Sequence, residues 1–208
     1  QEAMHMKLYY YPLSTYSQKV LLAFHEKDVP FTAVVLYPGD PQQRAELQKL
    51  TPLGKVPLLV LDNGWKVPES TTIIEYLDTH AGGPRMIPAD LDLARQTRFH
   101  DRLADLYVNE PYRTVAREPD PARVAAARER LDTMLGGLDN HLANRTWVMG
   151  DSFTLADCAM IPPLLQYGSA HPITRFEHVS AYFARAMERP SVMRVRREVE
   201  AFAAKAAS

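Results

Sequence analysis

The sequence of 208 residues contains one cysteine, Cys158, and no run of about 18 apolar residues such as a membrane-spanning helix needs. A single thiol cannot form an internal disulfide or a paired-cysteine redox motif, which indicates a reducing, cytoplasmic setting. The seven histidines follow no HxH or HExxH spacing, so we expect no metal site. With 24 Lys and Arg against 25 Asp and Glu, the net charge of −1 gives no electrostatic sign of nucleic-acid binding, which requires a strongly basic face.

The composition that remains is that of a globular protein. Apolar residues make up 46% and charged residues 24%, so the chain can bury a sizeable core. The segment Gln1–His5 is short and has no apolar stretch, so we do not expect a signal peptide, and Met4 or Met6 is the expected natural start. Together these features predict a cytoplasmic protein without a membrane partner.

The first 82 residues alternate strand-like and helix-like runs. Aromatic and aliphatic runs predict strands, and apolar stripes with helical spacing predict helices. We expect strands over 7–11, 31–36, 56–61 and 65–67, and helices over 17–27, 40–50 and 70–80. This order predicts a small mixed sheet covered by helices.

Glycine and proline interrupt the chain at 82–84, and we place a linker at about 82–88. No strand-like run follows, which predicts an α/β domain over 1–82 and an all-α domain over 83–208. Further apolar stripes predict helices over 90–117, 131–142, 154–169, 175–188 and 190–205. Pro162 and Pro163 predict a kink or break near 161–163.

The stretch Gly54-Lys55-Val56-Pro57 places a proline where a buried strand should begin. Proline removes a donor from the hydrogen-bond ladder, so this position is in conflict with a central strand. A cis bond between Val56 and Pro57 resolves the conflict, and it leaves the backbone of Val56 able to pair with an extended peptide. An ordinary edge-strand proline is the alternative.

The stretch Pro68-Glu69-Ser70-Thr71 directly precedes an apolar helix. Ser70 has the character of an N-cap, and free N–H groups at such a terminus bind a carboxylate. Glu69 beside it suits an ammonium group. The pair therefore suits the head of a free amino acid, and a simple helix cap is the alternative.

A third stretch, from Tyr10 to Ser17, joins a strand end to a helix through a loop with several hydroxyl side chains. A helix start beside a hydroxyl stabilises an anion. A polar loop with Ser17 as its helix cap is the alternative.

Taken together, these stretches resemble the cytosolic glutathione transferases over nearly the whole chain. The resemblance is carried by YPLSTYSQKVLLAFHEK, by LTPLGKVPLL at 50–59, by ESTTIIEYL at 69–77 and by GDSFTLAD at 150–157. It implies a thioredoxin-like N-terminal domain that binds glutathione as co-substrate and an all-helical C-terminal bundle that supplies the pocket for an electrophilic small molecule. It also implies a homodimer.

The resemblance assigns a role to each residue of the glutathione site. The backbone of Val56 would pair with the cysteinyl part of glutathione, and Glu69 and Ser70 would hold the γ-glutamyl amine and carboxylate. Lys55 would neutralise a carboxylate of glutathione, and Gln42 would reach its glycyl end.

The resemblance leaves two candidates for the catalytic hydroxyl. Ser14 matches the first serine of the Ser-type loop, with Ser17, Lys19 and Val20 following. Tyr10 lies near the strand-end position at which Tyr-type members keep their hydroxyl. We expect Ser14 to stabilise the glutathione thiolate.

The resemblance places the electrophile pocket between Leu13, the 90–117 helix and the C-terminal helix. The residues expected to line it are Phe99, Tyr107, Tyr112 and Arg113. His100 and Asp101 would face the glutathione of a partner subunit. Two alternatives to this transferase stay open: a non-catalytic protein-binding scaffold of the same family, and a glutathione-dependent isomerase of the maleylacetoacetate type.

Overall fold

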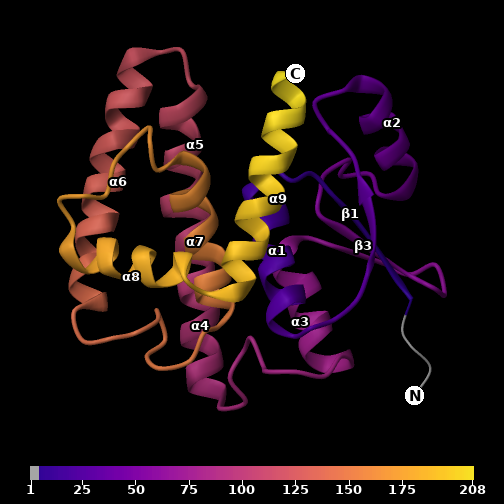
Figure 1. The fold of residues 1–208 in the computed structure, drawn as a ribbon, viewed down its shortest axis with the longest axis horizontal. Helices are drawn as coiled ribbons and strands as arrows, with labels where there is room; N and C mark the ends of the chain where they lie inside the picture. Colours follow the sequence, from indigo (N-terminus) through magenta and orange to yellow (C-terminus); the bar gives the residue numbers. More distant parts are fainter. Residues whose placement is uncertain (1–4) are drawn as a thin grey trace. The chain divides into compact units, whose positions relative to one another are not determined.

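The computed structural model describes residues 5–208, so the expectation about Met4 lies outside the described residues. Its contacts group the chain into two compact units (Figure 1). The first comprises the residues up to Pro84 together with Arg194–Ser208, and the second comprises Arg85–Met193. The last 15 residues of the chain, 194–208, were predicted to belong to the helical domain but group here with the first unit. The division into domains 1–82 and 83–208 stays a prediction.

The first unit is built on a four-stranded mixed sheet with strand order β2-β1-β3-β4. Strand β2 is parallel to β1, whereas β3 is antiparallel to both β1 and β4. The elements are β1 (Met6–Tyr10), α1 (Thr15–Glu26), β2 (Thr32–Val35), α2 (Pro41–Leu50), β3 (Leu58–Leu61), β4 (Lys66–Pro68) and α3 (Ser70–His80). The thioredoxin-like mixed sheet with helices is confirmed.

The core of this unit lies between the sheet and the helices α1 and α3, which pack against each other. Figure 1 shows α1 and α3 close together on one side of the sheet and α2 away from them. Phe24 of α1, Leu59 of β3 and Ile74 of α3 are fully buried. Burying each such side chain contributes roughly 1.5–3 kcal/mol, so this layer holds the two helices in fixed positions.

Several element boundaries differ from the sequence prediction by one or two residues, and two of them bear on the candidate site. Helix α1 begins at Thr15 rather than at Ser17, because Ser14 is the residue whose side chain caps it. Ser17 as the helix cap was therefore wrong. Strand β3 begins at Leu58, directly after Pro57, rather than at Val56. Helix α3 has the predicted bounds, Ser70–His80.

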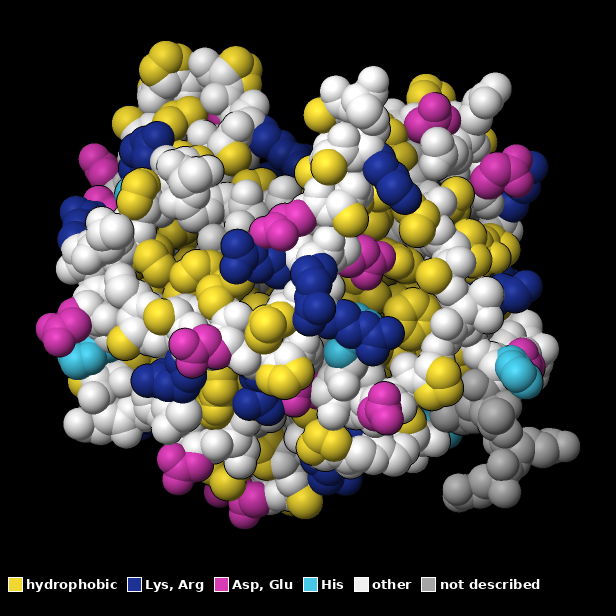
Figure 2. Space-filling view, viewed as in Figure 1, with side chains coloured by type: hydrophobic (Ala, Val, Ile, Leu, Met, Phe, Trp, Pro, Cys, Tyr) yellow, Lys and Arg dark blue, Asp and Glu magenta, His cyan; other side chains and the backbone are white. Residues whose placement is uncertain are grey.

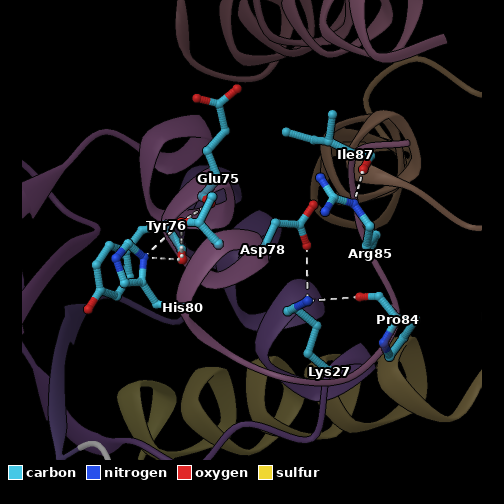
Figure 3. Close-up of polar contacts among 9 residues, drawn as sticks. Lys27, Glu75, Tyr76, Asp78, His80, Pro84, Arg85 and Ile87 are labelled. Atoms are coloured by element: carbon cyan, nitrogen blue, oxygen red, sulfur yellow. Dashed lines mark hydrogen bonds and ion pairs between the residues drawn. The ribbon is translucent and has the colours of Figure 1, made fainter. Parts of the chain in front are cut away.

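A buried ion pair joins the end of α1 to α3. Lys27 Nζ lies 3.0 Å from Asp78 Oδ1, and the two side chains are 1% and 3% exposed. The same ammonium donates to the carbonyl oxygen of Pro84 over 2.9 Å, as Figure 3 shows. Gly83, with φ of +81°, passes so close that a Cβ there would lie 2.7 Å from the Lys27 carbonyl oxygen. Lys27 thus fixes the course of the chain where it leaves α3.

Among the residues that the structure describes, the secondary-structure elements of the second unit are all helices, joined by loops. Its helices are α4 (Leu91–Leu103), η1 (Ala104–Asn109), α5 (Glu110–Arg117), α6 (Pro121–Leu142), α7 (Leu155–Tyr167), α8 (Glu177–Met187) and the start of α9 (Pro190–Ala207). The predicted helix over 90–117 is thus interrupted by the wider π-helical turn η1, where the Glu110 N–H donates to the Asp105 carbonyl. Pro111 follows directly; a proline lacks an N–H and crowds the carbonyl four residues before it, which a wider turn relieves.

Helix α7 runs through Pro162 and Pro163 without the predicted break. Nearly every residue of this helix is buried, so packing on all sides supports a backbone that two prolines deprive of hydrogen bonds. A capping box of Thr154 and Asp157 begins it, as the sequence indicates. Asp157 also accepts hydrogen bonds from the Val148 N–H and the Tyr182 hydroxyl, each over 3.0 Å.

Replacing Lys27 by methionine should leave the carboxylate of Asp78 buried beside an apolar side chain. We expect Lys27→Met to lower the free energy of unfolding by about 3–5 kcal/mol, measured by urea denaturation. The double variant Lys27→Met with Asp78→Leu removes both charges and should recover most of the loss. If the single variant were as stable as the original protein, the pair would not have the role described.

The buried carboxyl of Asp157 should make stability depend on pH. Burial raises its pKa from 3.8 to about 6, although the hydrogen bonds from Val148, Thr154 and Tyr182 oppose the shift. Because the folded state holds the proton more tightly, stability should fall as the pH rises from about 4 to about 6 and be level above that. Relative to Asp157→Asn, which has no titratable group there, the original protein should lose up to about 3 kcal/mol between pH 4 and 7. Urea unfolding at several pH values checks this, and a constant difference would contradict it.

Candidate active site

Ser14 lies where the loop after β1 meets the first turn of α1. Its Oγ accepts a hydrogen bond from the Ser17 N–H over 3.2 Å, which makes it the N-cap of the helix. Its backbone N–H donates to the Tyr11 carbonyl over 2.9 Å, so the loop is held on both sides of it. Within residues 5–208 the half-buried hydroxyl donates to no acceptor. The Ser14 proton is therefore available to an anion at the start of α1.

Tyr10 has a different environment. Its hydroxyl donates to Glu198 Oε1 on the C-terminal helix, and the side chain is 4% exposed. Burial, then the hydrogen bond to Glu198 and its negative charge, raise the pKa of Tyr10 well above its ordinary value. The phenol stays protonated and is already engaged, so Ser14 is the better placed of the two candidate hydroxyls to meet a ligand.

Pro57 is preceded by a cis peptide bond, which confirms the predicted form of the Val56–Pro57 linkage. The ladder between β3 and β4 ends with the pairing of Leu58 and Pro68. Val56 lies beyond it, and in the described chain neither its N–H nor its carbonyl makes a hydrogen bond. The backbone of Val56 can therefore pair with an added peptide strand.

Glu69 and Ser70 begin α3 in a way that the sequence did not indicate. Glu69, not Ser70, is the N-cap residue, and its side chain makes no capping hydrogen bond. Ser70 is the first helical residue, so its assignment as the cap was wrong. Glu69 has φ of +70°, a left-handed conformation that costs a non-glycine residue about 1–3 kcal/mol and that is concentrated at functional sites. The backbone N–H groups of the first turn of α3 therefore receive no cap from Glu69, and such a helix start suits a carboxylate.

Lys55 and Gln42 complete the predicted glutathione contacts on this unit. Lys55 is exposed, and among the described residues no carboxylate pairs with it. Gln42 is exposed in the first turn of α2, where its N–H donates to Asp40 Oδ1 over 2.9 Å. Both side chains are free to reach a ligand, and their roles stay predictions.

An aromatic cluster of Tyr11, Tyr37 and Phe202 lies beside this loop and was missed by the sequence analysis. The Tyr11 ring centroid is 4.9 Å from that of Tyr37 and 5.2 Å from that of Phe202. Phe202 comes from the C-terminal helix, where basic and acidic side chains are intermingled in Figure 2. One such pair joins Arg196 and Glu200, so the arginines of this helix fit the solvated face that the sequence indicates.

The prediction that Tyr112 lines the electrophile pocket is wrong. Tyr112 is fully buried and its hydroxyl donates to the His171 carbonyl over 2.8 Å, so it belongs to the core of the second unit. Phe99 and Tyr107 are 59% and 56% exposed, and Tyr107 lies on the π-helical turn η1. Leu13 is half-buried in the first unit. A pocket formed by Leu13, Phe99 and Tyr107 stays a prediction.

Arg113 is close to its neighbour Glu110, at 3.9 Å, a loose and exposed pair. His100 and Asp101 lie together at the end of α4. Burial, and then the positive charges of His141 and Arg145, lower the pKa of His100 to about 4, while Asp101 is 4% exposed. That these two residues face a partner's glutathione stays a prediction.

No group of three or more His, Cys, Asp or Glu side chains among the described residues could hold a metal ion. No helix in residues 5–208 has the length and apolar character needed to cross a bilayer.

Comparison with known proteins gives the same family for both units. The sequence matches the glutathione S-transferase N-terminal domain over residues 8–85 and the C-terminal domain over residues 96–190. A glutathione S-transferase of Pseudomonas putida is 30% identical over 158 residues, covering 73% of this chain and 70% of that protein. The glutathione S-transferase hmp2 of Hypomyces subiculosus is 30% identical over 201 residues, covering 87% and 92%.

A solved structure supports this assignment. The glutathione S-transferase of Methylobacillus flagellatus, solved with glutathione bound, superposes with a TM-score of 0.82 at 28% identity and covers 91% of this chain and 98% of its own. Matches to both domains and relatives at 30% identity agree. The chain belongs to the glutathione S-transferase family.

Proposed function

We propose that this protein is a glutathione transferase in which Ser14 stabilises the thiolate of glutathione for attack on an electrophilic small molecule. The observation that carries the proposal is the hydrogen bonding of Ser14: its oxygen is used by the Ser17 N–H, and its proton is open to a ligand. The relatives named glutathione S-transferase, and the neighbour solved with glutathione, support glutathione as the co-substrate.

The energetics of thiol activation are within reach of this loop. A free thiol has a pKa near 8.5, so little of it is ionised at neutral pH. Lowering that pKa by about two units requires about 2.7 kcal/mol. One hydrogen bond to a charged group contributes about 1.5–3 kcal/mol, and the N-terminus of α1 adds to it. No side chain needs to keep the thiol proton, which can pass to water.

The rest of the tripeptide would extend along the first unit. In the proposal the cysteinyl backbone pairs with Val56, the γ-glutamyl group is held by Glu69 and the start of α3, and Lys55 and Gln42 face its carboxylates. The backbone of Val56 supports this because it is unpaired at the end of the β3–β4 ladder. The uncapped start of α3 supports the carboxylate contact.

The proposal extends to the electrophile contacts, the oligomeric state and the cellular location of the enzyme. The electrophile would contact Leu13, Phe99 and Tyr107, the active form would be a homodimer, and the protein would act in the cytoplasm in detoxification. The exposed rings of Phe99 and Tyr107 support the first point. The single cysteine, which is buried and needs no oxidising compartment, supports the cytoplasmic location.

Ser14→Ala should raise the pKa of enzyme-bound glutathione by about one to two units, because it removes one hydrogen bond to the thiolate. The ultraviolet absorbance of the bound thiolate, recorded against pH, measures this shift. The conjugation rate at neutral pH should fall about tenfold to a hundredfold. Tyr10→Phe is the discriminating variant, because a phenol engaged with Glu198 should change the thiol pKa little. A larger shift in Tyr10→Phe than in Ser14→Ala would assign the role to Tyr10 instead.

A non-catalytic scaffold is the second candidate. Its support is the similarity to a stringent starvation protein A homolog from Coxiella burnetii. That protein is 31% identical over 162 residues, which cover 76% of this chain and 74% of that protein. The distinction is whether the protein binds glutathione. Retention on glutathione resin, with elution by free glutathione, supports the transferase, and a protein that passes through unretained supports the scaffold.

A further inference from the structure

Lys19 is a buried cation in the middle of α1. The residue is only 1% exposed and is among the largest fully buried side chains of the protein. Taking an ammonium group out of water is strongly unfavourable, whereas leucine or methionine would fill the same space between helices without that penalty. The charge of Lys19 therefore points to a use beyond packing.

One hydrogen bond of Lys19 shows where its ammonium group lies. Its Nζ donates to Thr71 Oγ1 over 2.9 Å. Thr71 is the second residue of α3, directly after Ser70, and α1 and α3 pack against each other in the first unit. The ammonium thus lies at the first turn of α3, the end of the helix at which the backbone dipole is already positive.

Two sources of positive potential therefore meet at one turn. Glu69 leaves α3 without a side-chain cap, so no Glu69 oxygen accepts from the backbone N–H groups of the first turn. The fixed ammonium of Lys19 adds its field from the protein interior, where screening by solvent is weak. An anion at this turn is attracted by both the helix end and the ammonium.

We propose that Lys19 is a positioning residue for the α-carboxylate of the γ-glutamyl group of glutathione. It acts through its charge from behind the first turn of α3, where the hydrogen bond to Thr71 holds its ammonium group, and it does not touch the ligand. The inference rests on the proposed glutathione site. Because the thiol is served by Ser14 at the start of α1, Lys19 governs affinity and leaves the thiolate pKa unchanged.

The test compares two ligands by isothermal titration calorimetry. One is reduced glutathione, and the other is the same tripeptide with its γ-glutamyl α-carboxylate converted to an amide. Lys19→Met should weaken glutathione binding about tenfold, or about 1.4 kcal/mol, and weaken binding of the amide less than about twofold. Lys19→Arg keeps the charge and should stay within about threefold of the original protein. Lys19→Gln keeps a donor for Thr71 without the charge and should behave as Lys19→Met does.

Lys27→Met is the matched control. It also removes a buried lysine, but one that caps the C-terminal end of α1 and pairs with Asp78, near the end of α3 rather than at its start. It should lower stability without changing the preference for glutathione over the amide. Should Lys19→Met fail to fold by circular dichroism, the Gln and Arg variants decide by the same ratio.

Three results would overturn the role of Lys19. They are unchanged glutathione binding in the uncharged variants, equal weakening of both ligands, and a shifted pKa of the bound thiol. If the unmodified protein gives no heat with glutathione, the proposed function fails instead, so the two failures are distinguishable.

Discussion

The hydrogen bond from the Ser17 N–H to the Ser14 hydroxyl oxygen sets the start of α1, and the candidate site depends on it. A hydroxyl that accepts from the backbone keeps its own proton to donate. The cap therefore gives the helix its first turn and directs a donor toward any anion at that end. Had Ser17 been the cap, the helix would begin later and the capping hydroxyl would lie three residues further along the chain.

The start of α3 also suits an anion, but there the N-cap residue provides no side-chain hydrogen bond. Glu69 adopts a positive φ and its side chain does not cap the helix, which leaves the helix start suited to a ligand carboxylate. Such an end is stable only because the rest of α3 is anchored elsewhere. Ile74 is buried against the sheet, and Asp78 pairs with Lys27. The burial of Ile74 and the ion pair of Asp78 thus permit a helix start without a side-chain cap.

Much of the fold could be predicted from the sequence because helices, strands and turns are specified by residues that lie close together in the chain. The bounds of α3 follow from an apolar stripe, and the cis bond before Pro57 follows from a proline that a strand could not otherwise hold. The backbone of Glu69 could not be predicted, since nothing in its neighbours requires a positive φ. The hydrogen bond between Tyr10 and Glu198 joins residues 188 positions apart, and short-range sequence patterns do not predict such a contact. Tyr112 was misplaced because an aromatic residue on a helix reads the same whether it faces a pocket or the core.

The central claim is that the first unit holds a thiol tripeptide with its sulfur at Ser14. A crystal structure of the glutathione complex tests it most directly. The account predicts the sulfur within hydrogen-bonding distance of Ser14 Oγ, the cysteinyl backbone paired with Val56, and the γ-glutamyl carboxylate at the first turn of α3. A sulfur closer to Tyr10 than to Ser14, or a γ-glutamyl group bound away from α3, would contradict it.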